Sequence, residues 1–151
     1  MKKNVILVLL TFVTLNLFAK APSGDKVDPT IEAKFKKQYG SLVNVTWKVI
    51  DDISIATYTD QGEERSVYYY DSGEVFGIGK IVKREELPES ITEAIKKRFS
   101  DGVVQTVYEF KAPAASTRYY VRVVTPRHSM VVSGDEFTGL QVNTKQKLSS
   151  F

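Results

Sequence analysis

The only histidine, His128, is followed directly by Ser129, and this is the one pair in the chain that suggests hydrolytic chemistry. A serine nucleophile needs a base and an orienting carboxylate within hydrogen-bond reach. Successive side chains of a strand point to opposite faces, so a strand that begins at residue 129 would keep the two side chains apart. We therefore interpret His128 as an exposed turn residue and assign no catalytic residue.

Carboxylate pairs are the second feature that could support acid–base chemistry. They occur at Asp51-Asp52, Glu63-Glu64, Glu85-Glu86 and Asp135-Glu136, each in a predicted turn or loop. An acid–base pair needs two different environments that separate the two pKa values, and neighbours in a solvated turn lack this difference. A hydrolase that uses these acidic turns or His128 is thus the least favoured class of function.

Metal and cofactor sites are also not indicated. The chain has no cysteine and one histidine, which excludes thiolate ligands, a cysteine nucleophile and any site with two imidazoles. Asp71-Ser72-Gly73-Glu74 offers oxygen ligands but lacks the pattern of a calcium loop. Gly77 and Gly79 follow strand spacing and open no helix, so they form no phosphate cradle. We expect no metal and no cofactor.

Aromatic and basic residues in the strands suggest binding instead. Tyr68 and Tyr70 lie on one face of their predicted strand. Arg118, Tyr120 and Arg122 likewise lie on one face of theirs. Tyr and Arg are enriched in protein interfaces, although Tyr also suits half-buried strand positions. The candidate protein-binding residues are Lys48, Tyr68, Tyr70, Glu109, Arg118, Tyr120 and Arg122.

Two amphipathic helices are expected to position these strands. Asp28-Pro29 provides an N-cap and a first-turn proline, and Gly40 a stop. A second helix is predicted after Leu87-Pro88 and before Asp101-Gly102. The two apolar stripes are 60 residues apart, Ile31, Phe35 and Tyr39 in the first and Ile91, Ile95 and Phe99 in the second.

Four strands are predicted after each helix, separated by turn residues. The ranges are 43–49, 53–59, 65–70 and 74–81 in the first half, and 104–110, 117–125, 129–133 and 137–142 in the second. Aligning Trp47 with Tyr108 predicts that Val104, Thr106, Tyr108 and Phe110 face the core while Gln105, Val107 and Glu109 face outward.

This repetition predicts a duplicated unit. We expect an α+β protein of two tandem α-β-β-β-β units with an antiparallel sheet, two helices on one face and the other face open. The units span residues 28–84 and 85–143 and together form one domain. Residues 22–27 are a leader and residues 144–151 a C-terminal tail.

The sequence resembles a known family through a helix that ends in Phe35 and Tyr39, Val45-x-Trp47, Ala56-Thr57-Tyr58, Tyr70-Asp71-Ser72-Gly73 and Leu87-Pro88. These features are similar to those of secreted PepSY-like proteins with a β-lactamase-inhibitor-like fold. The resemblance covers residues 27–143, with Tyr108 in place of Trp47 in the second half. It implies an exported, non-catalytic domain, and it assigns no inhibitory residue.

The N-terminus has the pattern of an export signal. Lys2 and Lys3 precede an apolar run over residues 5–18, shorter than the roughly 20 residues of a membrane-spanning helix. Cleavage after Ala19 or after Ala21 both remain open, and a retained N-terminal anchor is the alternative. Residues 1–21 contain three lysines and no acidic residue, so their removal leaves 18 basic and 18 acidic residues.

The mature chain is therefore expected in the periplasm or outside the cell, without a membrane anchor. Zero net charge gives no electrostatic basis for a nucleic-acid or acidic-membrane partner. The leading hypothesis is a non-enzymatic module that binds an unknown protein or peptide of the envelope or medium through its open sheet face. A small-ligand-binding or structural envelope protein is the alternative.

Overall fold

A computed structural model describes residues 24–40 and 45–148, so the predicted export signal lies outside the described residues. The helices are α2 (Pro29–Tyr39) and α3 (Glu89–Arg98), with a 3-10 turn at Arg84–Glu86. The strands are β1 (Thr46–Ile50), β2 (Ile53–Asp60), β3 (Glu63–Tyr70), β4 (Val75–Val82), β5 (Val103–Lys111), β6 (Arg118–Val124), β7 (His128–Gly134) and β8 (Gln141–Lys147).

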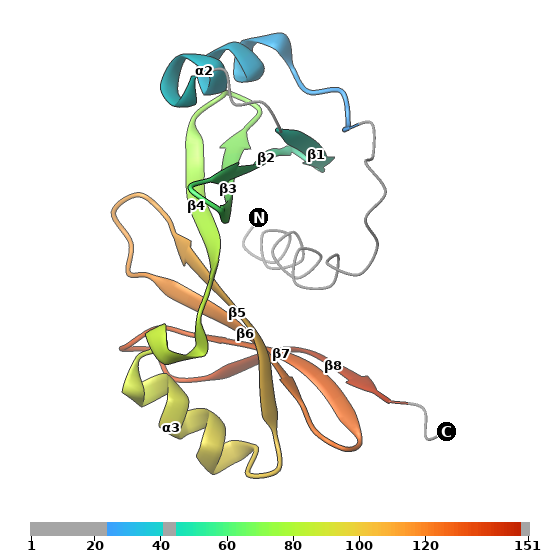
Figure 1. Cartoon of the computed structure of the whole chain (residues 1–151), viewed down its shortest axis with the longest axis vertical. Helices are drawn as coiled ribbons and strands as arrows, with labels where there is room; N and C mark the ends of the chain where they lie inside the picture. The colour runs from blue at the N-terminus through green and yellow to red at the C-terminus, as the bar shows by residue number, and fades with distance from the viewer. Residues whose placement is uncertain (1–23, 41–44, 149–151) are drawn as a thin grey trace. The chain divides into compact units, whose positions relative to one another are not determined.

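The strand order follows the chain order, and each of the two helices in the described residues is followed by four antiparallel strands (Figure 1). This confirms the predicted α+β class and the repeated helix-plus-four-strand pattern. The chain divides into two compact units, one running to residue 80 and the other starting at residue 81, with residues 111–115 grouped with the first.

The first unit is organised around helix α2. The Asp28 carboxylate accepts a hydrogen bond from the Thr30 amide at 2.7 Å, and Gly40 ends the helix at a φ of 78°, as expected from their sequence positions. The apolar stripe of α2 faces β2 and β3. Their core consists of Val27, Ile31, Phe35, Ala56, Tyr58, Val67 and Tyr69, with Tyr39, Val45, Trp47 and Val75 packed against it.

Three hydrogen bonds connect separate segments of this unit. The Asp25 amide donates to the Trp47 carbonyl, and the Val49 amide donates to the Asp25 carboxylate, both at 2.9 Å. The segment before α2 thus occupies part of the hydrogen-bonding edge of β1, which would otherwise be open to pairing with another chain. On the other side, the Lys34 ammonium donates to the Ser72 carbonyl at 3.1 Å and fixes the β3–β4 turn.

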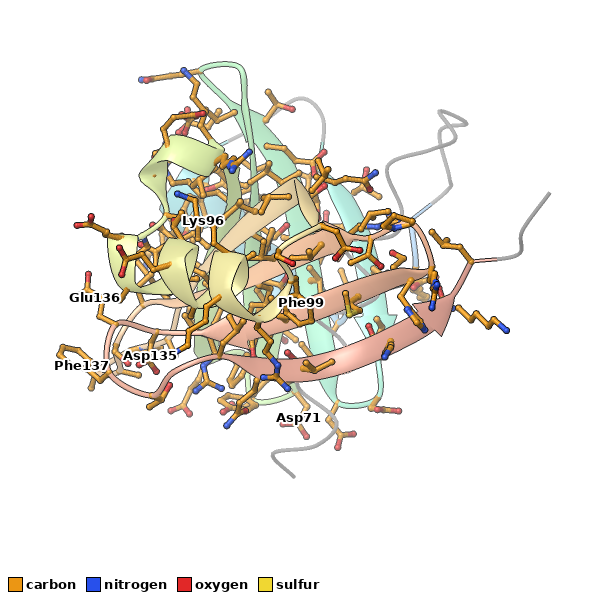
Figure 2. The ribbon with its side chains drawn as sticks, turned by 90° about the horizontal axis from the view of Figure 1, so that it is seen from below. Asp71, Lys96, Phe99, Asp135, Glu136 and Phe137 are labelled. Carbon is orange, nitrogen blue, oxygen red and sulfur yellow. The ribbon has the colours of Figure 1, made fainter. Side chains whose placement is uncertain are left out.

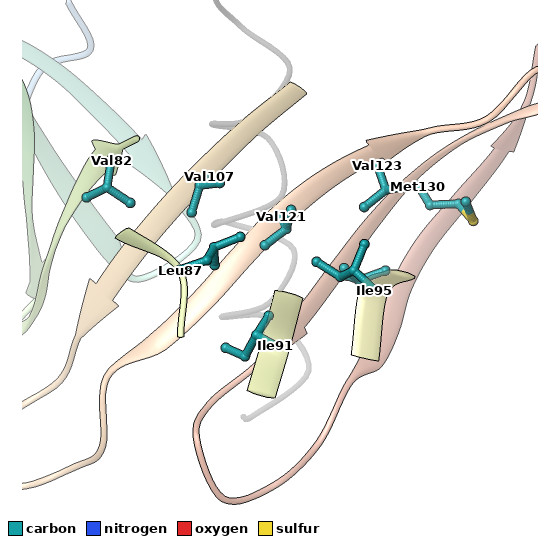
Figure 3. Packing of buried hydrophobic residues seen from close by; sticks show 9 residues of the cluster. Val82, Leu87, Ile91, Ile95, Val107, Val121, Val123 and Met130 are labelled. Atoms are coloured by element: carbon teal, nitrogen blue, oxygen red, sulfur yellow. The ribbon is translucent and has the colours of Figure 1, made fainter. Parts of the chain in front are cut away.

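The second unit repeats this design with aliphatic residues. Ile91 and Ile95 of α3 are 3% and 4% exposed, and Leu87 precedes them in the same core (Figure 3). Val107, Val121, Val123, Met130 and Val132 supply the strand side of this cluster. Because Ile31 and Ile91 are buried alike, and so are Phe35 and Ile95, the predicted equivalence of the two helical stripes is confirmed.

The predicted faces of β5 were wrong. Val107 pairs with Val121 and packs under α3, whereas Tyr108 pairs with Tyr120 on the opposite face. The cause is a register shift between Val104 and Thr106, where β5 contains one residue more than β6. A bulge moves all later side chains to the other face, so simple alternation from Val104 fails after it.

The last strand also differs from its prediction. We expected a strand over residues 137–142 and a tail from residue 144, but β8 spans Gln141–Lys147. The Asp135 carboxylate accepts hydrogen bonds from the Phe137 and Thr138 amides, and Gly139 has a φ of 68°. These features form a turn where the alternating apolar residues suggested a strand.

The hydroxyl of Tyr69 is buried in the first core without a hydrogen-bond partner among the described residues. The ring is 1% exposed among Tyr39, Tyr58 and Trp47. Burial raises the pKa of this phenol well above its ordinary value. A buried hydroxyl without a partner costs about 1–3 kcal/mol of desolvation.

We therefore expect Tyr69→Phe to raise the free energy of unfolding by about 1 kcal/mol, because it removes the unpartnered oxygen and keeps the ring. Urea denaturation checks the result. Tyr70→Phe is the matched control, since Tyr70 is 38% exposed and its change should stay within about 0.5 kcal/mol. A loss of stability in Tyr69→Phe would show that the hydroxyl has a partner in solution.

Candidate functional site

In the first unit, the predicted residues lie on the strand face opposite α2. Lys48 pairs with Ile55, and Ile55 pairs with Tyr68, so the three form one row across β1, β2 and β3. Tyr70 lies two positions along the same face, with its ring centroid 5.1 Å from that of Phe76. The structure therefore brings Lys48, Tyr68 and Tyr70 onto one face, as alternation predicted.

The expected exposure of Tyr68 was wrong, because this residue is fully buried. It lies on a central strand, with Ile55 in register on one side and Gly77 on the other. Flanking strands cannot cover a side chain that stands out from an open sheet face, and Gly77 has no side chain, so the complete burial of Tyr68 shows that this face is covered at this position and not open as predicted. On this face, Lys48 and Tyr70 are the predicted residues that remain accessible.

In the second unit, Arg118, Tyr120 and Arg122 share the face of β6 opposite α3, as predicted. Tyr119, Val121 and Val123 point the other way, toward the helix. The Arg122 Nε donates a hydrogen bond to the Ser129 Oγ of β7 at 3.3 Å. An Arg118 nitrogen lies 3.6 Å from the Asp135 carboxylate. Both guanidinium groups are therefore oriented by contacts to β7 and to the residue after it.

Tyr120, between these arginines, is 3% exposed, so its predicted exposure was also wrong. It pairs with Tyr108 on one side and with Ser133 on the other. Burial raises the pKa of the Tyr120 phenol, and the adjacent Arg118 partly offsets this shift. Ser133 is 1% exposed, and its hydroxyl has no hydrogen-bond partner among the described residues.

Glu109 does not belong to this group. It pairs with Tyr119, on the α3 side of the strands, because the β5 bulge reverses the faces. Burial and the Glu109 carboxylate raise the pKa of the Tyr119 phenol. The polar neighbours of Arg122 and Tyr120 are Ser129 and Ser133, not Glu109. Their alternation with Met130 and Val132 in the sequence was the signal that could have identified them.

Asp135 also differs from its sequence-based expectation. We expected a solvated turn, but its side chain is 4% exposed. Its carboxylate accepts hydrogen bonds from the Phe137 amide at 2.8 Å and from the Thr138 amide at 2.7 Å. Figure 2 shows Asp135 beside the ribbon and Phe137 at the tip of this turn, where it is 81% exposed.

The histidine–serine pair does not form a catalytic arrangement. His128 and Ser129 are successive residues of β7, and the Ser129 hydroxyl is engaged with Arg122. The His128 backbone is held by Thr125, whose hydroxyl accepts from the His128 amide at 3.1 Å. Within residues 24–40 and 45–148, no group of three or more acidic or histidine residues is arranged to hold a metal ion. No helix in these ranges is long and apolar enough to cross a membrane.

Comparison with known sequences and with solved structures gives different results. No protein-family model matches the chain, and no curated protein sequence matches it. Solved structures do match. A protein from Bacteroides eggerthii, described as a candidate periplasmic protein, superposes with a TM-score of 0.69 at 19% identity, covering 82% of this chain and 90% of its own.

Two further structures from the same genus have similar scores. A DUF2874 family protein from Bacteroides uniformis has a TM-score of 0.68 at 17% identity, with coverage of 81% and 90%. A BLIP-like protein from Bacteroides fragilis has a TM-score of 0.62 at 17% identity, with coverage of 85% and 92%. The chain therefore has the BLIP-like fold, the β-lactamase-inhibitor-like architecture that the sequence resemblance implied.

Proposed function

We propose that this chain is an exported, non-catalytic binding protein that engages a protein or peptide through the strand faces opposite its helices. The observation that supports this most directly is the Arg118-Tyr120-Arg122 row in the second unit. Its side chains lie away from α3, so the packing of the helix does not account for them. Lys48 and Tyr70 are the accessible residues on the corresponding face of the first unit, where Tyr68 is buried.

The chemistry of the second-unit row suits contact with a polypeptide. Arginine presents several donors in a planar fork, and Arg122 uses Nε on Ser129, which leaves its terminal nitrogens available. Such nitrogens bind backbone carbonyls and carboxylates. Tyr120 and the Ser133 hydroxyl beside them are buried, so the two arginines are the accessible part of this row.

The comparisons support this proposal at the level of class. A BLIP-like fold favours an inhibitor-type contact over catalysis, and a structural relative described as a candidate periplasmic protein supports the predicted export. We propose a periplasmic or secreted location on the same grounds, together with the N-terminal lysine-plus-apolar pattern.

The test compares how two charge-reversal variants, Arg122→Glu and Lys97→Glu, bind a partner protein. Immobilised protein is used to recover and identify envelope proteins by cross-linking and mass spectrometry, and each purified candidate is then titrated by calorimetry. We expect Arg122→Glu to weaken binding by about tenfold or more. Lys97→Glu, on the exposed side of α3, should leave binding unchanged. Equal affinity of both variants for every candidate would reject this face as the binding surface.

A further inference from the structure

A solvent-open depression of about 510 Å³ lies at the C-terminal end of α3, wholly within the second unit. Its wall combines the end of the helix with the β6–β7 turn and a residue of β8. Its volume falls in the range of small-molecule sites, about 300–1,000 Å³. It lies on the α3 side of the strands, because Met130 is one of its lining residues.

The floor of the depression is apolar. Met130 is 4% exposed and belongs to the core under α3. Phe99 is half-buried, and the Arg98 guanidinium lies 5.7 Å from the centroid of its ring. Figure 2 labels Phe99 at this end of the helix. A ligand with an aromatic or aliphatic group would gain contact with both side chains.

The rim of the depression is cationic. Arg98, Arg127 and Lys145 surround it, and Asp101 is its one acidic lining residue. Arg127 and Lys145 form no ion pair within the described part of the chain. The helix C-terminus adds a partial negative charge of about half a unit, so the three cations leave a net positive potential.

A hydrogen bond restrains the Arg98 side chain. One of its terminal nitrogens donates to the Leu140 carbonyl at 3.1 Å, which anchors the guanidinium beside the depression. The β6–β7 turn is likewise fixed, since the Thr125 amide donates to the His128 carbonyl and the Leu148 amide donates to the Arg127 carbonyl, both at 2.8 Å. Cationic groups on such ordered backbone lose less conformational freedom when an anion binds.

We propose that this depression binds a small organic anion, a phosphate or carboxylate that carries an apolar group. The anionic group pairs with Arg98, Arg127 and Lys145, and the apolar group lies on Phe99 and Met130. This site is separate from the proposed protein-binding face, because it lies on the opposite side of the strands. Its success or failure is therefore independent of the partner test above.

The probe is phenyl phosphate, which combines a doubly charged group with a ring, and binding is followed by NMR titration. We expect saturable shifts at Phe99 and Met130, weaker binding of inorganic phosphate, and no saturable binding of phenol. Arg127→Glu/Lys145→Glu should weaken phenyl phosphate binding by about tenfold or more. The matched control is Lys26→Glu/Lys37→Glu, which reverses two exposed lysines of the first unit and should bind as the wild type does.

Each other outcome overturns the proposal. These are no saturation by about 10 mM phenyl phosphate, equal weakening in both double variants, or shifts confined to residues outside the depression. If the glutamate variant does not fold, Arg127→Gln/Lys145→Gln removes the charge without reversing it and gives the same test. Binding of phenol as tight as that of phenyl phosphate would identify an apolar site and reject the anion site.

Discussion

Replacing Phe35 with alanine is expected to lower the free energy of unfolding by about 3–5 kcal/mol. Phe35 is 1% exposed at the centre of the first core. Its ring centroid lies 4.9 Å from that of Tyr39, 5.5 Å from that of Trp47 and 5.4 Å from that of Tyr58. The contacts with Trp47 and Tyr58 are edge-to-face, at 75° and 70°, the geometry that adds about 0.5–1.5 kcal/mol per pair.

The expected loss from Phe35→Ala is large compared with the total free energy of unfolding of a small domain. Small domains are stable by about 5–15 kcal/mol, so this loss is at least about a fifth of the total and reaches the whole of it for a domain at the low end. Urea denaturation measures it, and Trp47 is a direct probe because it is the only tryptophan and contacts Phe35. Its fluorescence should change in the folded variant, and the midpoint should fall.

The control is the same substitution at an exposed position. Phe137 is 81% exposed, so Phe137→Ala removes an equal volume without opening a cavity. We expect its effect to stay within about 0.5 kcal/mol. Similar losses from both substitutions would contradict the burial of Phe35, and a loss below about 1 kcal/mol at Phe35 would show that the core collapses around the gap.

The helices were predictable because their signals are local. Asp28 caps the first helix and Gly40 ends it, and both act within a few residues of the chain. The apolar spacing of Ile31 and Phe35 determines which face of α2 is buried. Such signals need no knowledge of a partner strand, so the two helices could be placed from the sequence, and so could most of the strands after them, with β8 as the exception.

The faces of the strands depend on non-local pairing and could be predicted only in part. No residue type marks the bulge in β5, yet it moves Glu109 to the α3 side and Tyr108 to the other. The burial of Tyr68 and Tyr120 requires that the strand face on which they lie is covered, which alternation within one strand does not reveal. The Arg118–Asp135 contact likewise requires the register of β6 and β7.

Asp135 should make the stability of the protein depend on pH below about 4. Hydrogen bonds from the Thr138 hydroxyl and the Phe137 amide, with help from Arg118, lower the pKa of this carboxyl to about 2. The folded state therefore favours the ionised form. A carboxyl whose pKa is lower in the folded than in the unfolded state stabilises the fold above the unfolded pKa, and this contribution disappears as the pH falls to the folded pKa.

We expect Asp135→Asn to lower the free energy of unfolding by about 2 kcal/mol at pH 7, since a shift of one unit corresponds to about 1.4 kcal/mol. The difference between wild type and variant should shrink between pH 4 and pH 2, where the wild-type carboxyl becomes protonated. Urea denaturation at pH 7, 4, 3 and 2 measures this difference, and other acidic residues cancel because both proteins contain them.

Asp71→Asn is the matched control, because Asp71 is an exposed turn residue on the first unit. It should lower stability by less than about 0.5 kcal/mol at every pH. A constant difference between Asp135→Asn and wild type from pH 7 to pH 2 would mean that the carboxylate charge contributes nothing and only the shape of the side chain matters. A difference that narrows as the pH falls would assign the stabilisation of the β7–β8 turn to the ionised Asp135, since protonation removes the charge and leaves the side chain in place.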